Sequence, residues 1–237
     1  MSKLILVRHG QSVWNLKNRF TGWVNVELTK NGELEAKKAG KLIKDLNINI
    51  DLFYSSIQLR AQNTLKLIQE VLGEERSSKS FWQLNERHYG ALTGLNKDEM
   101  KAKLGEGKVH QFRRSWDLKP EPLEKKNPYH PINIEIYKNV PKESIPDTES
   151  LKDTYERVIK FYKNEIEQKI VDNNILISAH GNSIRALCKY LFKLNNEQIT
   201  KLEIPTGNPL ILNLNNKKEI SECKYLDQDR AKDLLIF

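Results

Sequence analysis

The feature that most constrains the fold is a run of four aliphatic residues, Leu4 to Val7, which ends abruptly at Arg8, His9 and Gly10. A short continuous apolar run is typical of a strand buried on both faces, as in the middle of a parallel sheet. In open α/β sheets, ligands bind beyond the carboxyl ends of the strands. A guanidinium and an imidazole there, followed by a glycine that lets backbone approach closely, suit a phosphoryl group. The opening therefore predicts an anion site at a strand end.

The same pattern returns late in the chain at Ile175-Leu176-Ile177-Ser178-Ala179, which is followed by His180, Gly181 and Asn182. We expect a second buried strand here and a helix from about Ser183. If the two strands are neighbours in the sheet, His9 and His180 converge on one site. This convergence is the main geometric prediction.

The segments between these two strands alternate in type. Thr29 is expected to be the N-cap of a helix whose apolar residues recur at helical spacing through residue 46. Residues 51–56 predict a strand and residues 58–72 a helix, and strand–helix alternation favours right-handed crossovers. The expected fold class is therefore α/β: a three-layer sandwich in which a mostly parallel central sheet is flanked by helices.

The middle of the chain has a different character. We interpret residues 84–90 as a polar turn, too charged to be a core segment. Two short helices are expected between residues 96 and 114, separated at Gly105 and Gly107, and most of the eight prolines lie between residues 117 and 147. Long loops in a compact domain are usually functional, so residues 91–147 are expected to form an insertion over the site. No linker divides the chain, and we expect residues 1–237 to form one domain.

The end of the chain predicts a second helix–strand series. Ser150 and Asp153 resemble a capping box, and the residues after them carry an apolar stripe at helical spacing. Residues 209–214 and 219–226 are expected to be the closing strands. Cys188 and Cys223 lack metal-ligand spacing, so we expect both to be reduced and structural.

Charge and hydrophobicity exclude several classes of function. A net charge of +8 favours anionic partners, but the lysines are scattered rather than gathered in a stripe, so we expect no nucleic-acid binding. No apolar run approaches the roughly 18 residues of a membrane span, and the first strand leaves no room for a signal peptide. We therefore expect no membrane contact and a cytoplasmic location.

Short motifs spread along the chain carry a family resemblance. In order they are Arg8-His9-Gly10-Gln11-Ser12-Val13-Trp14-Asn15, Phe20-Thr21-Gly22-Trp23, Arg60, Glu86-Arg87-His88-Tyr89-Gly90, Gly94-Leu95-Asn96-Lys97, Arg113-Arg114 and Ala179-His180-Gly181-Asn182-Ser183. This order resembles the histidine phosphatase superfamily and, more narrowly, its cofactor-dependent phosphoglycerate mutases. The resemblance runs from about Leu4 to Leu226.

The resemblance implies interconversion of 2-phosphoglycerate and 3-phosphoglycerate through a phosphohistidine at His9, with 2,3-bisphosphoglycerate as primer. It also implies a homodimer or homotetramer. Arg8, Arg60 and His180 would surround the transferring phosphoryl group, and Glu86 would act as acid and base. The residues expected to bind the rest of the substrate are Asn15, Thr21, Gly22, Arg87, Tyr89, Lys97, Arg113, Arg114, Gly181 and Asn182.

The residue types support this chemistry on their own terms. A neutral imidazole is nucleophilic near neutral pH, and a backbone carbonyl that accepts the Nδ1 proton of His9 would leave Nε2 facing phosphorus. Phosphoryl transfer spreads negative charge over three oxygens, which arginines held in place can stabilise without a metal ion. For Glu86 two effects oppose each other: phosphate oxygens would raise the pKa of the carboxyl group, and arginines would lower it.

Three other functions remain possible on the sequence alone. A broad phosphatase would share the catalytic residues but would not need Lys97, Arg113 or Arg114. A non-catalytic anion-binding or nucleic-acid-binding protein would keep the fold without turnover. His9, His180 and Glu86 are also the ligand types of a two-histidine, one-carboxylate iron site, which the adjacent Arg8 and Arg60 would disfavour.

Two positions depart from the family pattern. Gln11 stands where many members carry glutamate, which removes a charge beside His9. The chain ends at Asp233-Leu234-Leu235-Ile236-Phe237, whereas many members continue into a tail that covers the site. A missing cover would admit water, so we expect the balance between phosphoryl transfer and hydrolysis to shift towards hydrolysis.

Overall fold

A six-stranded sheet forms the centre of the computed structural model, which describes residues 2–215 and 219–231. The strands are β1 (Ser2–Arg8), β2 (Leu52–Ser55), β3 (Lys79–Ser80), β4 (Ile175–Ala179), β5 (Pro209–Leu214) and β6 (Ile220–Tyr225), in the order β3-β2-β4-β1-β5-β6. The first four run parallel, and β5 pairs antiparallel with both β1 and β6. The mostly parallel sheet is therefore confirmed.

β1 and β4 are direct neighbours, as the prediction required. Their register places Leu4 opposite Ile175 and Arg8 opposite Ala179. The two strands therefore end side by side, and the histidine that follows each of them starts from the same edge of the sheet.

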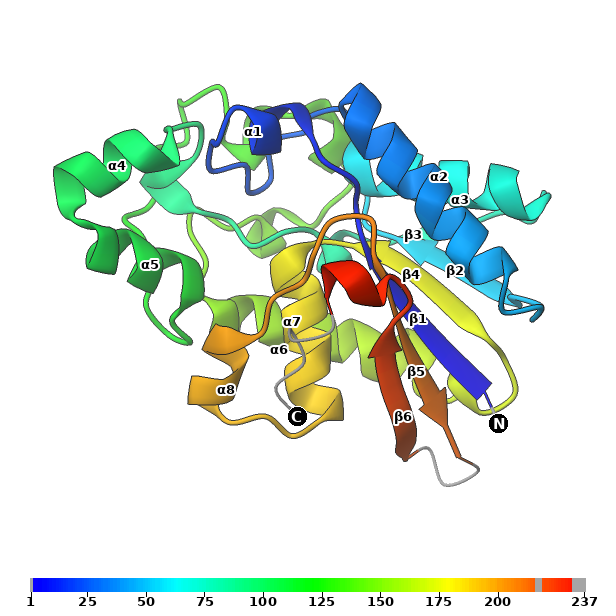
Figure 1. Cartoon of the computed structure of the whole chain (residues 1–237). Coiled ribbons are helices and arrows are strands. Elements are labelled where there is room, and N and C mark those ends of the chain that lie inside the picture. The colour runs from blue at the N-terminus through cyan, green and yellow to red at the C-terminus, as the bar shows by residue number, and fades with distance from the viewer. Residues whose placement is uncertain (1, 216–218, 232–237) are drawn as a thin grey trace.

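Helices cover both faces of the sheet (Figure 1). On one face lie α2 (Lys30–Lys44) and α3 (Leu59–Leu72), which pack on Ile5 and Val7. On the other lie α6 (Leu151–Phe161), its π-helical extension Tyr162–Ile166, and α7 (Gly181–Leu191), which pack with Leu4 and Leu6. Alternate residues of β1 thus enter two separate cores, which explains why the strand is apolar without interruption.

The predicted helix starts are present. The Thr29 side chain accepts a hydrogen bond from the Gly32 amide at the start of α2, and Ser150 and Asp153 form the capping box of α6. α7 starts at Gly181, two residues before the predicted position.

The segment 91–147 contains α4 (Lys97–Leu104) and α5 (Glu106–Arg114) and otherwise only short 3-10 turns. The two helices meet at Gly105, whose φ of 84° suits glycine, whereas Gly107 lies inside α5. Figure 1 shows both helices set apart from the sheet. The remaining helices are α1 (Val13–Leu16) and α8 (Asn196–Lys201), and the 3-10 turns are Trp82–Leu84, Gly90–Leu92, Pro131–Asn133, Glu135–Tyr137, Lys142–Ser144, Lys169–Val171 and Gln228–Arg230.

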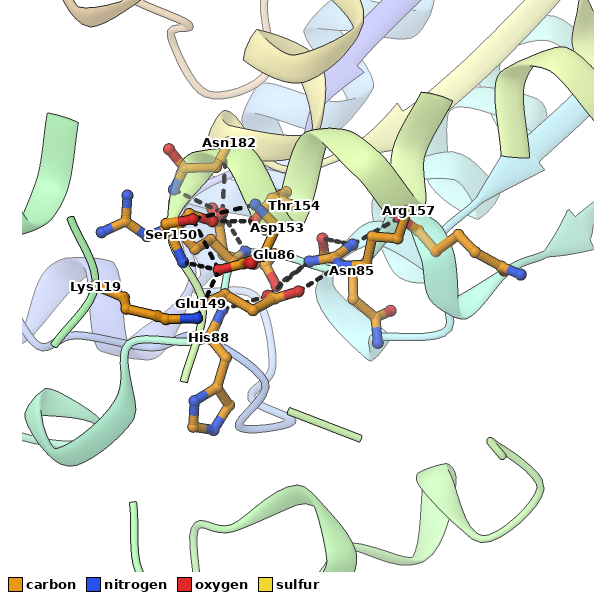
Figure 2. A network of polar contacts seen from close by, with 12 residues as sticks. Asn85, Glu86, His88, Lys119, Glu149, Ser150, Asp153, Thr154, Arg157 and Asn182 are labelled. Atoms are coloured by element: carbon orange, nitrogen blue, oxygen red, sulfur yellow. Dashed lines mark hydrogen bonds and ion pairs between the residues drawn. The ribbon is translucent and has the colours of Figure 1, made fainter. Parts of the chain in front are cut away.

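The interpretation of residues 84–90 as a turn outside the core is wrong. Asn85, Glu86, Arg87 and His88 are all buried. Their backbone has specific partners: the Arg157 guanidinium donates to the carbonyls of Gln83, Asn85 and Glu86, as Figure 2 shows in part. Charge in a sequence segment argues against burial only when such partners are lacking.

Three further expectations concern membrane-spanning helices, the two cysteines and the end of the chain. Within residues 2–215 and 219–231, no helix is long and apolar enough to span a membrane. Cys188 and Cys223 are both free thiols. The expectation about the tail rests on residues 233–237, which lie outside the described residues.

Candidate active site

His9 and His180 meet, as predicted, at the ends of β1 and β4. Their ring centroids lie 5.0 Å apart, and the His9 amide donates to the Ala179 carbonyl at 3.0 Å. Both side chains are buried. Two residues separated by most of the chain therefore form one small site because the strands before them are parallel neighbours.

The hydrogen bonds of His9 fix its tautomer. Nδ1 lies 2.7 Å from the Gly10 carbonyl oxygen, which can only accept, so Nδ1 carries the proton and Nε2 keeps its lone pair, which accepts a hydrogen bond from Arg60 Nε. Burial, followed by the charges of Arg60 and Arg8, holds the pKa of His9 well below its ordinary value. The imidazole is therefore neutral, as a histidine nucleophile requires.

Two arginines border this nucleophile candidate. Arg60 lies in the first turn of α3, and its Nε donates to His9 Nε2 at 3.3 Å, while its terminal nitrogens donate to the carbonyls of Gly22 and Val24. Burial lowers the pKa of Arg60 to about 10, so it stays charged near neutral pH. Arg8 donates to the Ile204 carbonyl at 2.8 Å, and its Nε has no partner among the described residues.

His180 differs from His9 in its partner. Its Nε2 lies 2.7 Å from Oγ of Ser56, and its Nδ1 has no hydrogen-bond partner in the part of the chain that the structure describes. Burial and the neighbouring Arg60 hold the pKa of His180 well below its ordinary value. The geometry and charge therefore favour a hydrogen-bonding role for His180 over a cationic one.

Glu86 is held with one oxygen engaged. Its Oε1 accepts from the Arg87 amide at 2.7 Å and from the Asn182 side chain at 2.8 Å, a contact drawn in Figure 2. Its Oε2 has no hydrogen bond among the described residues, which leaves it available to exchange a proton. The backbone on either side is tied to a buried ion pair, because Arg157 donates to the Glu86 carbonyl and Glu149 accepts from the His88 amide.

A cleft connects these groups with the helices of segment 91–147. The predicted site residues that line it are Arg8, His9, Asn15, Thr21, Gly22, Arg60, Glu86, Tyr89, Lys97, Arg113, Arg114, Gly181 and Asn182. Among its lining residues, Glu86 is the one carboxylate beside seven arginines and lysines. The cleft is therefore suited to a small molecule with several negative charges.

Two predicted site residues do not line the cleft. His180 lies beneath it, against His9. Arg87 is buried with its guanidinium 5.1 Å from the centre of the Tyr89 ring, and the three guanidinium nitrogens have no hydrogen-bond partner among the described residues. Tyr89 lines the cleft and Arg87 does not, so the structure shows no direct access of Arg87 to a ligand there.

Sequence reasoning missed three residues at the site: Arg19, Arg185 and Ser56. Arg19 and Arg185 line the cleft, and Ser56 contacts His180. Arg19 directly precedes the Phe20-Thr21-Gly22-Trp23 motif and Arg185 lies three residues after Asn182 on α7, so their proximity to predicted ligands was a usable signal. Ser56 is one of two adjacent serines at a strand end, and nothing in the sequence marked it as a site residue.

The outer side of the cleft gathers cations from α4 and α5. Burial, with the charges of Arg113 and Arg8, lowers the pKa of Lys97 to about 8. Arg114 forms an ion pair with Glu203, which also lies 3.4 Å from Arg185. These charges are close enough to repel one another, and an anion between them would relieve that repulsion.

The iron-site alternative gains no support from this geometry. Among the described residues, no three histidine, cysteine or carboxylate side chains are grouped so as to hold a metal ion. In addition, the Arg60 guanidinium lies against His9 Nε2, where it would repel a cation.

Comparison with known proteins places this site in a family. The sequence profile of the histidine phosphatase superfamily (branch 1) matches residues 4–130 and 127–224. A 2,3-bisphosphoglycerate-dependent phosphoglycerate mutase from Pelagibacter ubique is 71% identical over the whole of both chains. Another from Borrelia garinii is 48% identical over 99% of this chain and 96% of its own length.

Solved structures share the fold. A mycobacterial glucosyl-3-phosphoglycerate phosphatase complexed with VO3 superimposes with a TM-score of 0.69 over 95% of this chain and 97% of its own, at 23% identity. The YhfR protein of Bacillus stearothermophilus gives a TM-score of 0.69 over 93% and 94% of the two chains, at 19% identity. The chain belongs to the histidine phosphatase superfamily and, within it, to the 2,3-bisphosphoglycerate-dependent phosphoglycerate mutases.

Proposed function

We propose that this enzyme interconverts 2-phosphoglycerate and 3-phosphoglycerate through a phosphohistidine at His9. The observation that carries the proposal is the tautomer of His9: a neutral ring whose unprotonated Nε2 accepts a hydrogen bond from Arg60 in a cleft lined by cations. The mutase names of relatives at 71% and 48% identity support the same conclusion.

The residues fit the primer that the family name implies. When bound, 2,3-bisphosphoglycerate supplies the phosphoryl group that makes His9 competent for transfer. The cleft offers seven cationic side chains, and the buried Arg8 Nε and His180 Nδ1 have no partners in the described part of the chain. Two phosphates and a carboxylate would satisfy this excess of positive charge and these free donors.

The residues around His9 divide the work of transfer. His9 Nε2 attacks phosphorus, while Arg8, Arg60 and an N–H of His180 stabilise the charge that develops on the phosphoryl oxygens. Glu86 protonates the leaving alkoxide through its free Oε2 and takes the proton back from the accepting hydroxyl in the reverse transfer. Because the same group gives and receives this proton, it needs access from the cleft, and Glu86 lines it.

The remaining residues bind and orient the substrate. Lys97, Arg113 and Arg114, with the newly identified Arg19 and Arg185, face the carboxylate and the phosphate that is not transferred. Asn15, Thr21, Gly22, Tyr89, Gly181 and Asn182 add neutral donors, and the last pair of these lies at the start of α7, where backbone N–H groups favour anions. Arg87 acts through Tyr89 and through its charge.

The proposal also covers the setting of the enzyme. It includes one domain over residues 1–237 with segment 91–147 as a lid, a homodimer or homotetramer, a cytoplasmic location and no requirement for a metal ion. Cations of the chain occupy the positions where phosphoryl-transfer enzymes otherwise use metals. Neither nucleic acid nor membrane is a proposed partner.

A coupled assay with 3-phosphoglycerate tests the proposal. We expect turnover that is stimulated by 2,3-bisphosphoglycerate and unaffected by a chelator. Protein incubated with the bisphosphate should carry an acid-labile, base-stable phosphate. Release of inorganic phosphate without mutase turnover would instead support a phosphatase, and a label on serine would contradict the phosphohistidine.

A further inference from the structure

Ser56 is a buried residue directly after β2, and the proposed mechanism does not yet use it. Its Oγ lies within hydrogen-bond distance of His180 Nε2, at 2.7 Å. Its backbone amide donates to the Ser178 carbonyl at 3.2 Å, so β4 holds Ser56 in the sheet that also carries His180. Ser56 is thus fixed relative to the histidine it contacts.

The protons around Ser56 determine which nitrogen of His180 is protonated. The Ser56 oxygen accepts a hydrogen bond from the Gln58 amide at 3.2 Å. Its single hydroxyl proton then has one acceptor within reach among the described residues, His180 Nε2. Nε2 therefore accepts, and the neutral ring carries its proton on Nδ1.

The Nδ1–H group is left without a partner. It is buried and makes no hydrogen bond in residues 2–215 and 219–231, and the ring lies 5.0 Å from that of His9. A buried N–H without an acceptor is costly, unless an acceptor arrives with a ligand. The nearest place where the proposed reaction develops negative charge is the phosphoryl group on His9.

We propose that Ser56 is a positioning residue that selects the Nδ1–H tautomer of His180 and so keeps a hydrogen-bond donor ready for the transferring phosphoryl group. This inference rests on the proposed function. The two histidines are then complementary: the Gly10 carbonyl leaves His9 with a lone pair on Nε2, which Arg60 contacts, and the Ser56 hydroxyl leaves His180 with an unpartnered N–H on Nδ1. In the other tautomer, the lone pair of His180 Nδ1 would repel the phosphoryl oxygens.

Nitrogen NMR of the resting protein tests the tautomer directly. In protein labelled with ¹⁵N at histidine, correlations between ring protons and nitrogens distinguish the two tautomers. We expect His180 to be protonated at Nδ1, with its signals assigned by their absence in His180→Gln. Protonation at Nε2 in the wild-type protein overturns the inference, whatever the variants do.

Two serine variants separate the role of Ser56 from general packing. Ser56→Ala should shift His180 towards a mixture of tautomers and leave His9 unchanged. Ser55→Ala is the matched control, because Ser55 is an adjacent, buried serine whose hydroxyl contacts Ser80 instead. We expect it to leave the His180 signals as they are. An unchanged Nδ1–H tautomer in Ser56→Ala overturns the inference.

Kinetics supply the second readout. Ser56→Ala should lower kcat at least about tenfold, because one donor to the transition state is misplaced, and change KM less than about twofold. Ser56→Thr keeps the hydroxyl and should restore most of kcat. A KM effect without a kcat effect contradicts the inference. Failure of the proposed function has a different signature, because the wild-type protein would then show no mutase turnover. The tautomer of His180 would still be decided by the NMR measurement.

Discussion

The two sides of the cleft are built differently. We call His9, His180, Arg8 and Arg60 the floor, and Lys97, Arg113 and Arg114 the rim. The floor side chains lie at or directly after the ends of β1 and β4 or in the first turn of α3, and backbone carbonyls or a buried hydroxyl hold them in place. Their positions are therefore fixed by the two large cores beneath them.

The rim has much less support. α4 has no buried residue among those described, and α5 has one, Val109, in a small cluster with Phe20 and Leu92. Arg114 is held by Glu203, whose side chain is 46% exposed. The contrast teaches that the geometry of phosphoryl transfer is preorganised, whereas the groups that recognise the rest of the substrate can adjust. Few buried contacts are what allow a segment to move at low cost.

The largest expected effect is on the floor. His9→Ala should reduce mutase activity roughly 10⁴-fold or more, because it removes the group that carries the phosphoryl intermediate. The coupled assay measures the loss, and circular dichroism melting should show that the variant still folds. Formation of phosphoenzyme by this variant would contradict the assignment of the transfer chemistry to the floor, since a residue other than His9 would then carry the phosphoryl group.

The support of Glu86 should be the next most sensitive feature. Arg157→Met leaves Glu149 buried and unpaired, so we expect a loss of about 3 kcal/mol or more in the free energy of unfolding. It should also lower kcat about tenfold, because the backbone around Glu86 loses its donors. Urea denaturation and the coupled assay measure the two effects.

Lys201→Met serves as the control for Arg157→Met. It breaks an exposed ion pair with Glu197 and should change stability by less than about 1 kcal/mol. Equal losses in the two variants would show that the buried pair has no special role.

The rim should respond to pH through Lys97. Its pKa of about 8 means that it is charged below pH 8 and becomes neutral above it. We therefore expect KM for 3-phosphoglycerate to rise between about pH 7.5 and 9, because the free enzyme loses a cation, while kcat changes less. Steady-state kinetics over this range measure the shift. Lys97→Met should have a higher KM than the wild-type protein at every pH, and this KM should no longer rise between about pH 7.5 and 9. If the KM of the variant still rises over this range, another titrating group causes the pH dependence.

The smallest effect is expected at Glu203. Glu203→Gln removes a half-exposed partner of Arg114 and Arg185, so stability should change by less than about 1 kcal/mol. KM for 3-phosphoglycerate should change no more than about twofold, and a decrease would indicate that Glu203 competes with the substrate for Arg114. A tenfold loss of kcat would contradict the view that the rim is separate from the chemistry.

Much of the fold could be predicted because local patterns agreed with the tertiary structure. The apolar runs at residues 4–7 and 175–179 became neighbouring strands, and Thr29 and Ser150 capped helices. The interpretation of residues 84–90 failed because their burial depends on Arg157, more than 60 residues away in the sequence. Such long-range partners leave no local signal.

The sequence by itself determined the chemistry that is present: two histidines after apolar strands, arginines beside them, and a glutamate in a charged motif. Only the tertiary structure decided how these groups are used. Strand order brought the histidines to 5.0 Å, the Gly10 carbonyl placed the His9 proton on Nδ1, the Ser56 hydroxyl was brought into contact with His180 Nε2, and burial made both rings neutral. The reason is physical: residue types set which protons and charges are available, whereas desolvation and hydrogen-bond partners, which arise only on folding, decide where they reside.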